Sequence, residues 1–428
     1  MKIVIIGAGS YVFTPTVIED LIITSKLQDC EIVLVDLNME VVDLLAKITR
    51  RIAEDNGIRV KVTASTDRKN ALYGADYVIN TAAIQGAKRW LMDYEICLDE
   101  GIPHECREAG ALSGISYGFR TIKLMMDICR DIENLCPKAK LMSVSNPLTK
   151  VHEAIHRYTN VDAYGFCNVA QGGAHGYDLV ANILGRSYKE IYVVSAGVNH
   201  FSWIVSIKDK VTGADLFPEY LNKLYESSKH NKDHEIVWQW YEEYGAIAAP
   251  PVDHACEFLP YQSNIKYIDT PPFHGSESER LQRIEEMKQM ASGELDYRNV
   301  DYFLGASWEH PGLVIGAIKK QTFLHLNALN VPNVGYLPQL PEGAIIEVPA
   351  EVKDSKIQPY KDIYLPEKTV DICMNQCIVS GMVAQAAVEN NYELAKNIID
   401  IDISITHKTA AKNAIKRMIA AHSDILTK

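Results

Sequence analysis

The feature that most constrains this chain is a strand-like run at its start that leads straight into a glycine turn. Lys2–Ile6 is a short apolar run rich in β-branched residues, and Gly7-Ala8-Gly9-Ser10 follows it before a stretch with helical spacing. Glycines at this point allow a tight turn and let a pyrophosphate approach the backbone, while the next helix N-terminus supplies free N–H groups. The third position of the fingerprint is Val12 rather than Gly or Ala, so a purely structural strand–turn–helix is the alternative.

An acidic residue after the next strand-like run favours a dinucleotide site. Asp36 follows the run Glu31–Val35 directly, where a carboxylate can accept hydrogen bonds from ribose hydroxyls. It would repel a 2′-phosphate, so NAD is expected rather than NADP. Gly7, Gly9, Ser10 and Asp36 are therefore predicted to bind NAD.

Strand-like and helix-like patterns alternate through the first part of the chain. Such alternation predicts a parallel, doubly wound sheet of the Rossmann type. The expected strands are Lys2–Ile6, Glu31–Val35, Arg59–Ala64, Asp76–Thr81 and Ala139–Ser145, and the expected helices are Pro15–Thr24, Met39–Glu54 and Ile115–Leu135.

The length of 428 residues calls for more than one domain of about 150 residues. We expect an NAD-binding domain over residues 1–190 and a mixed α+β domain over residues 191–428. Its expected elements are strands at Glu190–Val194 and Ile204–Ile207, a loop at Asn264–Pro272, a charged helix at Glu277–Met290, an extended crossing loop at Val331–Glu347, and helices at Glu367–Glu389, Tyr392–Ile399 and Lys408–His422.

The overall charge and the cysteine pattern narrow the class of partner. The net charge is −12, which argues against nucleic acid or a membrane surface, since both need a basic face. No apolar run approaches the roughly 18 residues of a membrane span. The nine cysteines are scattered and odd in number, which favours reduced thiols and a cytoplasmic protein.

Polar residues follow several expected strands, and ligands of an open α/β sheet sit at the carboxyl ends of strands. Asn80 and Asn146 are therefore expected to line the nicotinamide side of the cofactor site. Cys167 and His200 lie in similar positions and form a plausible ligand pair for a divalent transition metal. On spacing alone, the case for a metal is poor, because a lone cysteine is usually a core residue and a lone histidine is more often a satisfied buried residue.

Several motifs in this order resemble glycoside hydrolase family four, the NAD- and manganese-dependent glycosidases, over nearly the whole length. They are Gly7-Ala8-Gly9-Ser10 with Phe13 close behind, Ser145-Asn146-Pro147, Cys167-Asn168, Gly197-Val198-Asn199-His200 and Asn333-Val334-Gly335-Tyr336-Leu337-Pro338-Gln339-Leu340-Pro341. The resemblance implies that Cys167 and His200 bind Mn²⁺ and that Phe13 belongs to the NAD site.

The resemblance also implies a mechanism that differs from the two-carboxylate glycosidases. NAD takes a hydride from C3 of the sugar, the metal polarises the resulting ketone, and a base removes the C2 proton. The aglycone then leaves, water adds, and the hydride returns, so the net reaction is hydrolysis.

The stretch from Asp253 to Tyr261 holds both candidates for that base. We favour Asp253, which is already ionised at neutral pH, over Tyr261. Asn168 stands where some relatives have an acidic residue, and an amide cannot act as the acid. The residues expected to bind substrate are Asn146, Asn168, Arg120, Asn199, His254 and Glu257.

The expected substrate is an α-linked, unphosphorylated hexoside or hexuronide, because the Asp253–Tyr261 stretch resembles that branch. Ser307-Trp308-Glu309-His310 contains no arginine for a phosphate, whereas Arg107 and Arg120 keep a sugar carboxylate possible. Cys167-Asn168 resembles instead the 6-phospho-β-glucosidases, which is the first alternative. A malate- or lactate-type dehydrogenase and a non-enzymatic NAD sensor are the others, and we expect a homo-oligomer, a dimer or a tetramer.

Overall fold

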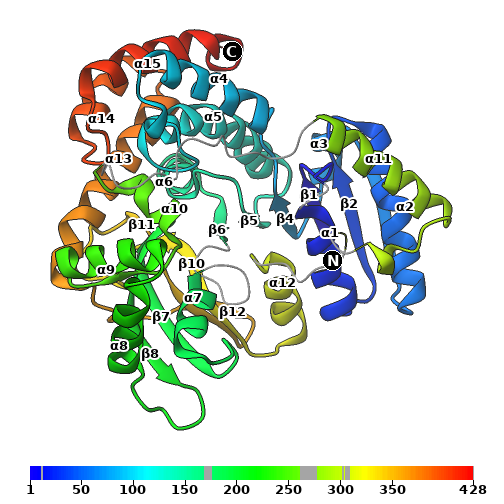
Figure 1. Cartoon of the computed structure of the whole chain (residues 1–428). Helices are drawn as coiled ribbons and strands as arrows, with labels where there is room; N and C mark the ends of the chain where they lie inside the picture. The colour runs from blue at the N-terminus through cyan, green and yellow to red at the C-terminus, as the bar shows by residue number, and fades with distance from the viewer. Residues whose placement is uncertain (11–12, 168–175, 261–276, 301–302, 304–308, 428) are drawn as a thin grey trace.

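A computed structural model describes residues 1–10, 13–167, 176–260, 277–300, 303 and 309–427 of the chain (Figure 1). Asn168, Tyr261 and the expected loop at Asn264–Pro272 lie outside the described residues.

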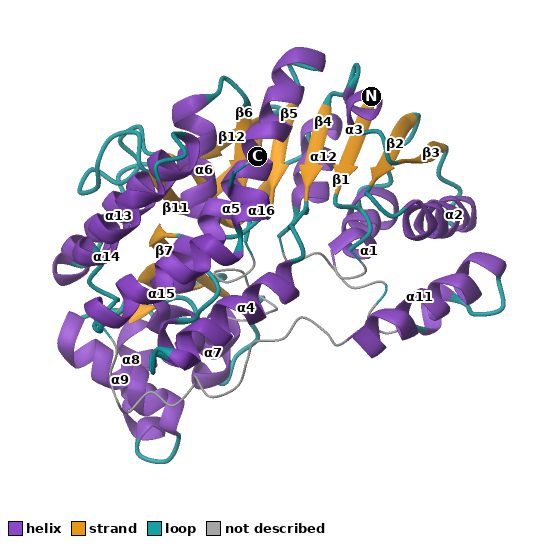
Figure 2. Ribbon diagram, turned by 90° about the horizontal axis from the view of Figure 1, so that it is seen from above, coloured by secondary structure: helices purple, strands orange, loops and turns teal. Residues whose placement is uncertain are grey.

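Six parallel strands form the first half of a single large sheet (Figure 2). Their order is β3-β2-β1-β4-β5-β6, the order of a Rossmann fold. The strands are β1 (Lys2–Ile6), β2 (Cys30–Val35), β3 (Val60–Ser65), β4 (Tyr77–Asn80), β5 (Lys140–Ser143) and β6 (Asp162–Gly165). The predicted doubly wound parallel sheet is confirmed, although β6 was not expected.

Side chains of the strands alternate between two buried faces. Ile3 and Ile5 of β1 pack in one core, and Val4 and Ile6 pack in the other. The first core includes side chains of α1 (Phe13–Ile18), η1 (Glu19–Thr24) and α2 (Met39–Asp55), and the second includes side chains of α5 (Ala111–Leu135) and α6 (Leu148–Tyr158). Helices on both faces explain why these strands read as continuous apolar runs.

The sheet continues beyond β6 with antiparallel strands, so the two halves of the chain share one sheet of 12 strands. The continuing order is β10 (Leu324–Pro332), β11 (Ile345–Lys353), β7 (Ile191–Val198), β8 (Phe201–Asp209) and β9 (Ile247–Ala248), with β12 (Lys356–Pro359) on β11. The prediction of a crossing loop over Val331–Glu347 is wrong at both ends, because the first residues of this range lie in β10 and the last lie in β11. Its Pro- and Gly-rich centre is only the connection between two paired strands.

The C-terminal helices return to the N-terminal part of the molecule. In Figure 1 the last helices lie against α4 and α5, and the chain end is beside them. They are η5 (Glu367–Thr369), α13 (Val370–Val388), η6 (Tyr392–Leu394), α14 (Ala395–Ile401), α15 (Lys408–Ala421) and α16 (Ser423–Leu426). The domain boundary near residue 190 stays a prediction.

The remaining elements complete the layers around the sheet. The expected charged helix is confirmed as α11, which packs on α2 (Figure 1). The others are α3 (Arg68–Leu72), α4 (Gly86–Asp99), η2 (Pro103–Glu105), α7 (Gly176–Leu184), α8 (Phe217–Ser228), α9 (Lys232–Tyr244), α10 (Val252–Ala255), η3 (Cys256–Phe258), α11 (Glu277–Ser292), η4 (Tyr297–Asn299) and α12 (Pro311–Lys320). Among the described residues, no helix has the length and apolar character to cross a membrane.

Candidate active site

The glycine turn after β1 brings the backbone close to two neighbouring segments. A Cβ on Gly7, which has φ 80°, would lie 2.5 Å from the backbone nitrogen of Ala82. A Cβ on Gly9 would lie 2.8 Å from the carboxyl carbon of Asp36, and the Gly9 N–H donates to Asp36 Oδ2 at 2.9 Å. The packing of these segments therefore requires glycine at both positions. It also places the Asp36 carboxylate beside the turn, as in a dinucleotide-binding site.

The start of the helix after this turn is held by the predicted serine. Ser10 Oγ accepts a hydrogen bond from the Phe13 N–H at 3.1 Å. Both residues thus lie at the glycine turn where they were expected, at the N-terminal end of α1. Their contact with NAD stays a prediction.

The carboxyl ends of the parallel strands place the glycine turn and the other motifs along one edge of the sheet. Ile6 pairs with Asn80, Asn80 with Ser143, and Ser143 with Gly165. Three strand spacings of about 4.8 Å separate β1 from β6, so the Cys167 loop starts roughly 14 Å from the glycine turn. A ligand about the size of a dinucleotide with a sugar beside it would span this edge.

A cluster of three ionisable side chains lies at this edge. Glu108, His200 and His254 each offer a donor atom within 4.8 Å of the other two. Asn146 Nδ2 donates to Glu108 Oε1 at 2.9 Å, and Asp253 Oδ1 lies 2.9 Å from His254 Nδ1. The structure therefore brings Asn146, His200, His254 and Asp253 together, as expected from the sequence, and adds Glu108, which sequence reasoning missed.

The hairpin between β7 and β8 presents His200 to this cluster. His200 lies in the tight turn with φ 64°, a left-handed conformation that histidine adopts more readily than most residues. It is only 2% exposed, and among the described residues its Nδ1 has no hydrogen-bond partner. A buried imidazole nitrogen without a partner, facing a carboxylate, fits a bound divalent transition metal.

The neighbouring Asn199 is held in a buried network. It is 3% exposed, and its Nδ2 donates to Glu347 Oε2 at 2.8 Å. Ser202 and Asn330 donate to the same carboxylate, so the network fixes the turn that carries His200. Among the described residues, Asn199 Oδ1 has no hydrogen-bond partner, and contact of Asn199 with substrate stays a prediction.

The two histidines of the cluster have opposite electrostatics. Burial, with a further contribution from His254, lowers the pKa of His200 to about 3, so its imidazole is neutral. Burial also disfavours the charged form of His254, but its hydrogen bond to Asp253 and the charges of Glu257, Asp253 and Glu108 outweigh this and raise its pKa to about 9. A neutral His200 is the protonation state that a metal ligand needs.

Glu257, which was expected to bind substrate, makes buried structural contacts. Its Oε2 accepts hydrogen bonds from the backbone N–H groups of Ala109 and Gly110, both at 2.8 Å, and the residue is 4% exposed. Lys150, also buried, donates to the Ala109 carbonyl at 2.8 Å. Together they hold the segment that carries Glu108, and contact of Glu257 with substrate stays a prediction.

Asn80 also has an internal partner. Its side chain is 0% exposed, and its Nδ2 donates to Ser145 Oγ at 2.7 Å, which joins β4 to the loop after β5. Among the described residues, its Oδ1 has no hydrogen-bond partner. Contact of Asn80 with the cofactor stays a prediction.

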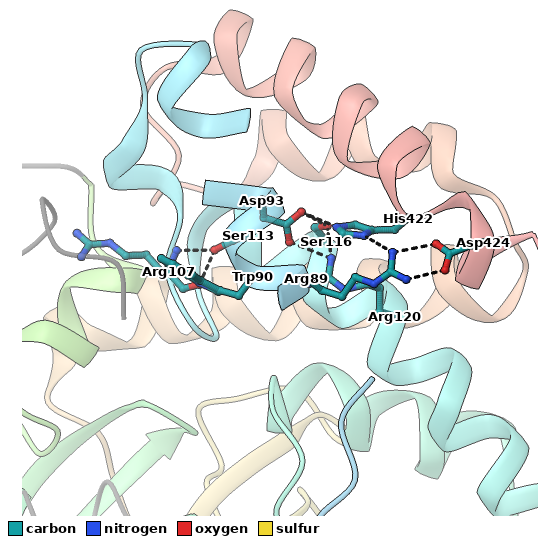
Figure 3. Close-up of polar contacts among 9 residues, drawn as sticks. All are labelled: Arg89, Trp90, Asp93, Arg107, Ser113, Ser116, Arg120, His422 and Asp424. Atoms are coloured by element: carbon teal, nitrogen blue, oxygen red, sulfur yellow. Dashed lines mark hydrogen bonds and ion pairs between the residues drawn. The ribbon is translucent and has the colours of Figure 1, made fainter. Parts of the chain in front are cut away.

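Arg120, also expected to bind substrate, lies in a buried ion pair, and its contact with substrate stays a prediction. Its guanidinium is buried and donates to Asp93 Oδ2 at 2.9 Å and to Ser116 Oγ at 2.7 Å (Figure 3). His422 lies 2.8 Å from the other oxygen of Asp93. This buried ion pair explains the arginine without a substrate, because an unpaired charge at this position would be costly.

Arg107, in contrast, extends away from that buried cluster (Figure 3). Its backbone is held by Trp90 Nε1, which donates to the Arg107 carbonyl at 2.9 Å, and by Ser113. The side chain of Arg107 is thus still available as a cationic contact next to Glu108.

Cys167 lies two residues beyond β6 and is 7% exposed, packed with Leu148. Among the described residues, it belongs to neither of the two groups of three ligand-type side chains that the structure contains. His200 is thus in a cluster suited to a metal, and ligation by Cys167 stays a prediction.

The fold and this edge define a Rossmann-type enzyme with a dinucleotide turn and a metal-type cluster on the same side of the sheet. Comparison with sequence-family models identifies the chain further. Residues 2–184 match the family 4 glycosyl hydrolases and residues 195–404 match the C-terminal domain of the same family. The chain therefore belongs to family 4 of the glycosyl hydrolases, and it is a glycosidase.

The chain is similar to several known proteins over nearly its whole length. It is 29% identical to an α-galactosidase of Rhizobium meliloti, covering 92% of this chain and 82% of the relative. It is 27% identical to an α-galactosidase of Bacillus subtilis, covering 99% of each. A 6-phospho-α-glucosidase from gut microorganisms, solved in complex with NAD and Mn²⁺, superposes with a TM-score of 0.80 at 20% identity, covering 99% of this chain and 98% of the other.

Proposed function

We propose that this protein hydrolyses an α-linked, unphosphorylated hexoside or hexuronide with NAD and Mn²⁺. The observation that carries the proposal is the cluster of Glu108, His200 and His254 on the same edge as the glycine turn and Asp36. An ordinary glycosidase needs two carboxylates and neither of these features. The similarity to a structure that holds NAD and Mn²⁺ supports both cofactors.

Residues of this chain suit the two cofactors in different ways. Gly7, Gly9 and Asp36 would hold NAD through backbone approach and ribose hydrogen bonds. Cys167 and His200 would hold the metal, with a Glu108 oxygen as a further ligand. When bound, NAD supplies a hydride acceptor for C3 of the sugar and Mn²⁺ supplies a Lewis acid.

The protein's own groups then serve to position the sugar and move one proton. Asp253 is the proposed base for the C2 proton: its side chain is 57% exposed, and His254 holds one of its oxygens at 2.9 Å. Asn146 donates to Glu108 and so orients that carboxylate within the cluster. Tyr261 is the alternative base, and Asn168 a proposed sugar contact.

The preference for an unphosphorylated sugar rests on charge. Glu309 is buried, and a carboxyl group cannot pair with a phosphate as an arginine does. Arg107 directly precedes Glu108 in the chain, and an arginine suits a sugar carboxylate. Two of the relatives are named α-galactosidases, without mention of a phosphate. The 6-phospho-β-glucosidase reading, favoured by Cys167-Asn168, is the alternative.

Hydrolysis in D₂O tests the reaction class. Removal and return of the C2 proton would place deuterium at C2 of the product sugar, with no net NADH. Unlabelled C2 would contradict the proposal, and net NADH from a 2-hydroxy acid would favour the dehydrogenase.

A panel of nitrophenyl glycosides with and without a 6-phosphate tests the substrate, in the presence of NAD, Mn²⁺ and reductant. We expect turnover of α-galactosides, α-glucosides or α-hexuronides. Turnover confined to phosphorylated sugars would contradict the choice of an unphosphorylated substrate.

We also propose that the protein is a homo-oligomer and is located in the cytoplasm.

A further inference from the structure

A second group of ligand-type side chains lies apart from the proposed catalytic cluster. His104 and Glu105 belong to the short turn η2, and His407 immediately precedes α15, about 300 residues later in the chain. Their donor atoms all lie within 4.8 Å of one another. His104 Nε2 is 3.1 Å from His407 Nδ1 and 3.8 Å from Glu105 Oε1.

These separations suit a small tetrahedral ion. Zinc–nitrogen bonds of 2.0–2.1 Å place neighbouring ligand atoms of a tetrahedron about 3.3 Å apart. Two histidine nitrogens and one carboxylate oxygen form a known zinc donor set, with water as the fourth ligand. His407 is exposed and His104 partly exposed, so the fourth position can face solvent.

The carboxylate supplies an independent sign that a cation belongs here. Glu105 is 1% exposed, and its Oε1 accepts from the Thr406 N–H at 3.1 Å. Among the described residues, its Oε2 is buried without a hydrogen-bond partner. The nearby Lys408 ammonium donates instead to the carbonyls of Ile399 and Asp402.

A buried carboxyl group with an open oxygen is costly to the fold unless a cation or a proton occupies the position.

We propose that His104, Glu105 and His407 bind a zinc ion that fastens the start of α15 to the η2 turn. The bound ion would join two segments far apart in the sequence, and η2 lies just before the Arg107–Gly110 segment that carries Glu108. Its role is to stabilise the fold, and it is separate from the Mn²⁺ proposed for catalysis.

The test uses the full-length His200→Ala protein, which lacks the proposed catalytic metal site, after removal of metals with a chelator. Titration with Co²⁺, followed by visible absorption, and with Zn²⁺, followed by calorimetry, should show one tetrahedral site per chain. Adding His407→Ala should weaken Zn²⁺ binding by on the order of 100-fold or more. His230→Ala, which removes an exposed histidine of the α8–α9 connection, should leave it unchanged.

The Glu105→Gln variant tests whether this cluster is a metal site or only a structural turn. It keeps an oxygen for the Thr406 N–H but removes the charge, so the metal-free protein should be at least as stable as the parent. Zinc should raise the melting temperature of the parent and not that of the variant. Absence of a bound equivalent in His200→Ala, or unchanged affinity with His407→Ala and Glu105→Gln, would overturn the proposal.

Discussion

Replacing Glu257 distinguishes the role expected from the sequence from the role seen in the structure. The sequence pattern predicts a contact with the sugar, whereas the structure shows Oε2 accepting from the Ala109 and Gly110 N–H groups at 2.8 Å. Glu257→Ala removes the acceptor for two buried donors, so the effect should fall on stability as well as activity.

The size of the effect follows from those two bonds. Leaving a buried backbone N–H unsatisfied costs about 1–3 kcal/mol, so the loss of the acceptor for two such groups should lower the free energy of unfolding of Glu257→Ala by roughly 2–6 kcal/mol. Glu257→Gln is the matched control: its amide oxygen can accept from both N–H groups, and the loss should be about 1–2 kcal/mol, since only the charge is removed.

The assay is guanidinium unfolding of the cofactor-free and metal-free proteins, followed by tryptophan fluorescence, with kcat and KM measured in parallel. We expect Glu257→Ala to shift the unfolding midpoint and to weaken Mn²⁺ binding, because Glu108 loses its support. If the free energy of unfolding of Glu257→Ala lies within about 1 kcal/mol of the parent value and its KM is raised, the structural role is refuted. Such a result would favour a direct contact of Glu257 with the sugar.

Three further predictions concern the cofactor, the metal and a buried carboxylate. Asp36→Ala should weaken NAD binding, measured by calorimetry, by on the order of tenfold and should reduce the preference for NAD over NADP. An unchanged ratio of the two affinities would show that Asp36 does not bind the ribose. His200→Ala and Cys167→Ser should each lower Mn²⁺ affinity by about 100-fold, and full activity of both variants after chelation would reject them as ligands. Burial raises the pKa of Glu347, although Asn199, Asn330 and Ser202 hydrogen-bond to it. A carboxyl group whose pKa is raised in the folded state makes the parent protein lose stability as the pH rises. The free energy of unfolding of Glu347→Gln, compared with that of the parent, should therefore be higher at about pH 8 than at about pH 5. Melting curves that give the same stability difference between variant and parent at the two pH values would contradict this.

Local patterns were enough to predict the N-terminal fold. A β-branched run, a glycine turn and a helical stretch are each determined by neighbouring residues, and their repetition specifies a parallel sheet. The same local information placed Gly9 beside Asp36 at the end of β2. It did not reveal that β10 and β11 extend the sheet, since their pairing partners lie far away in the chain.

The candidate site was predicted in part. Asn146 follows β5, His200 lies in the turn between β7 and β8, and Asp253 and His254 lie in the short helix α10. The structure brings these four residues together. Glu108 was missed because a single acidic residue in a loop carries no periodic signal; its position just before Ala109-Gly110 was the only indication.

The sequence by itself determined the class of this protein: a strand–glycine–helix start, an acidic second strand end and ordered Cys and His motifs. Only the tertiary structure decided what each polar atom contacts. Asn80, Asn199, Arg120 and Glu257 all lie beside functional motifs, yet each has at least one polar atom bound to a buried partner. Among the described residues, Oδ1 of Asn80 and Oδ1 of Asn199 have no hydrogen-bond partner. A buried donor or acceptor must find a partner, and that partner can lie anywhere in the chain: 148 residues away for Asn199 and Glu347. Residue type and spacing therefore indicate where polar chemistry gathers, and three-dimensional packing decides which groups are left to act on a substrate.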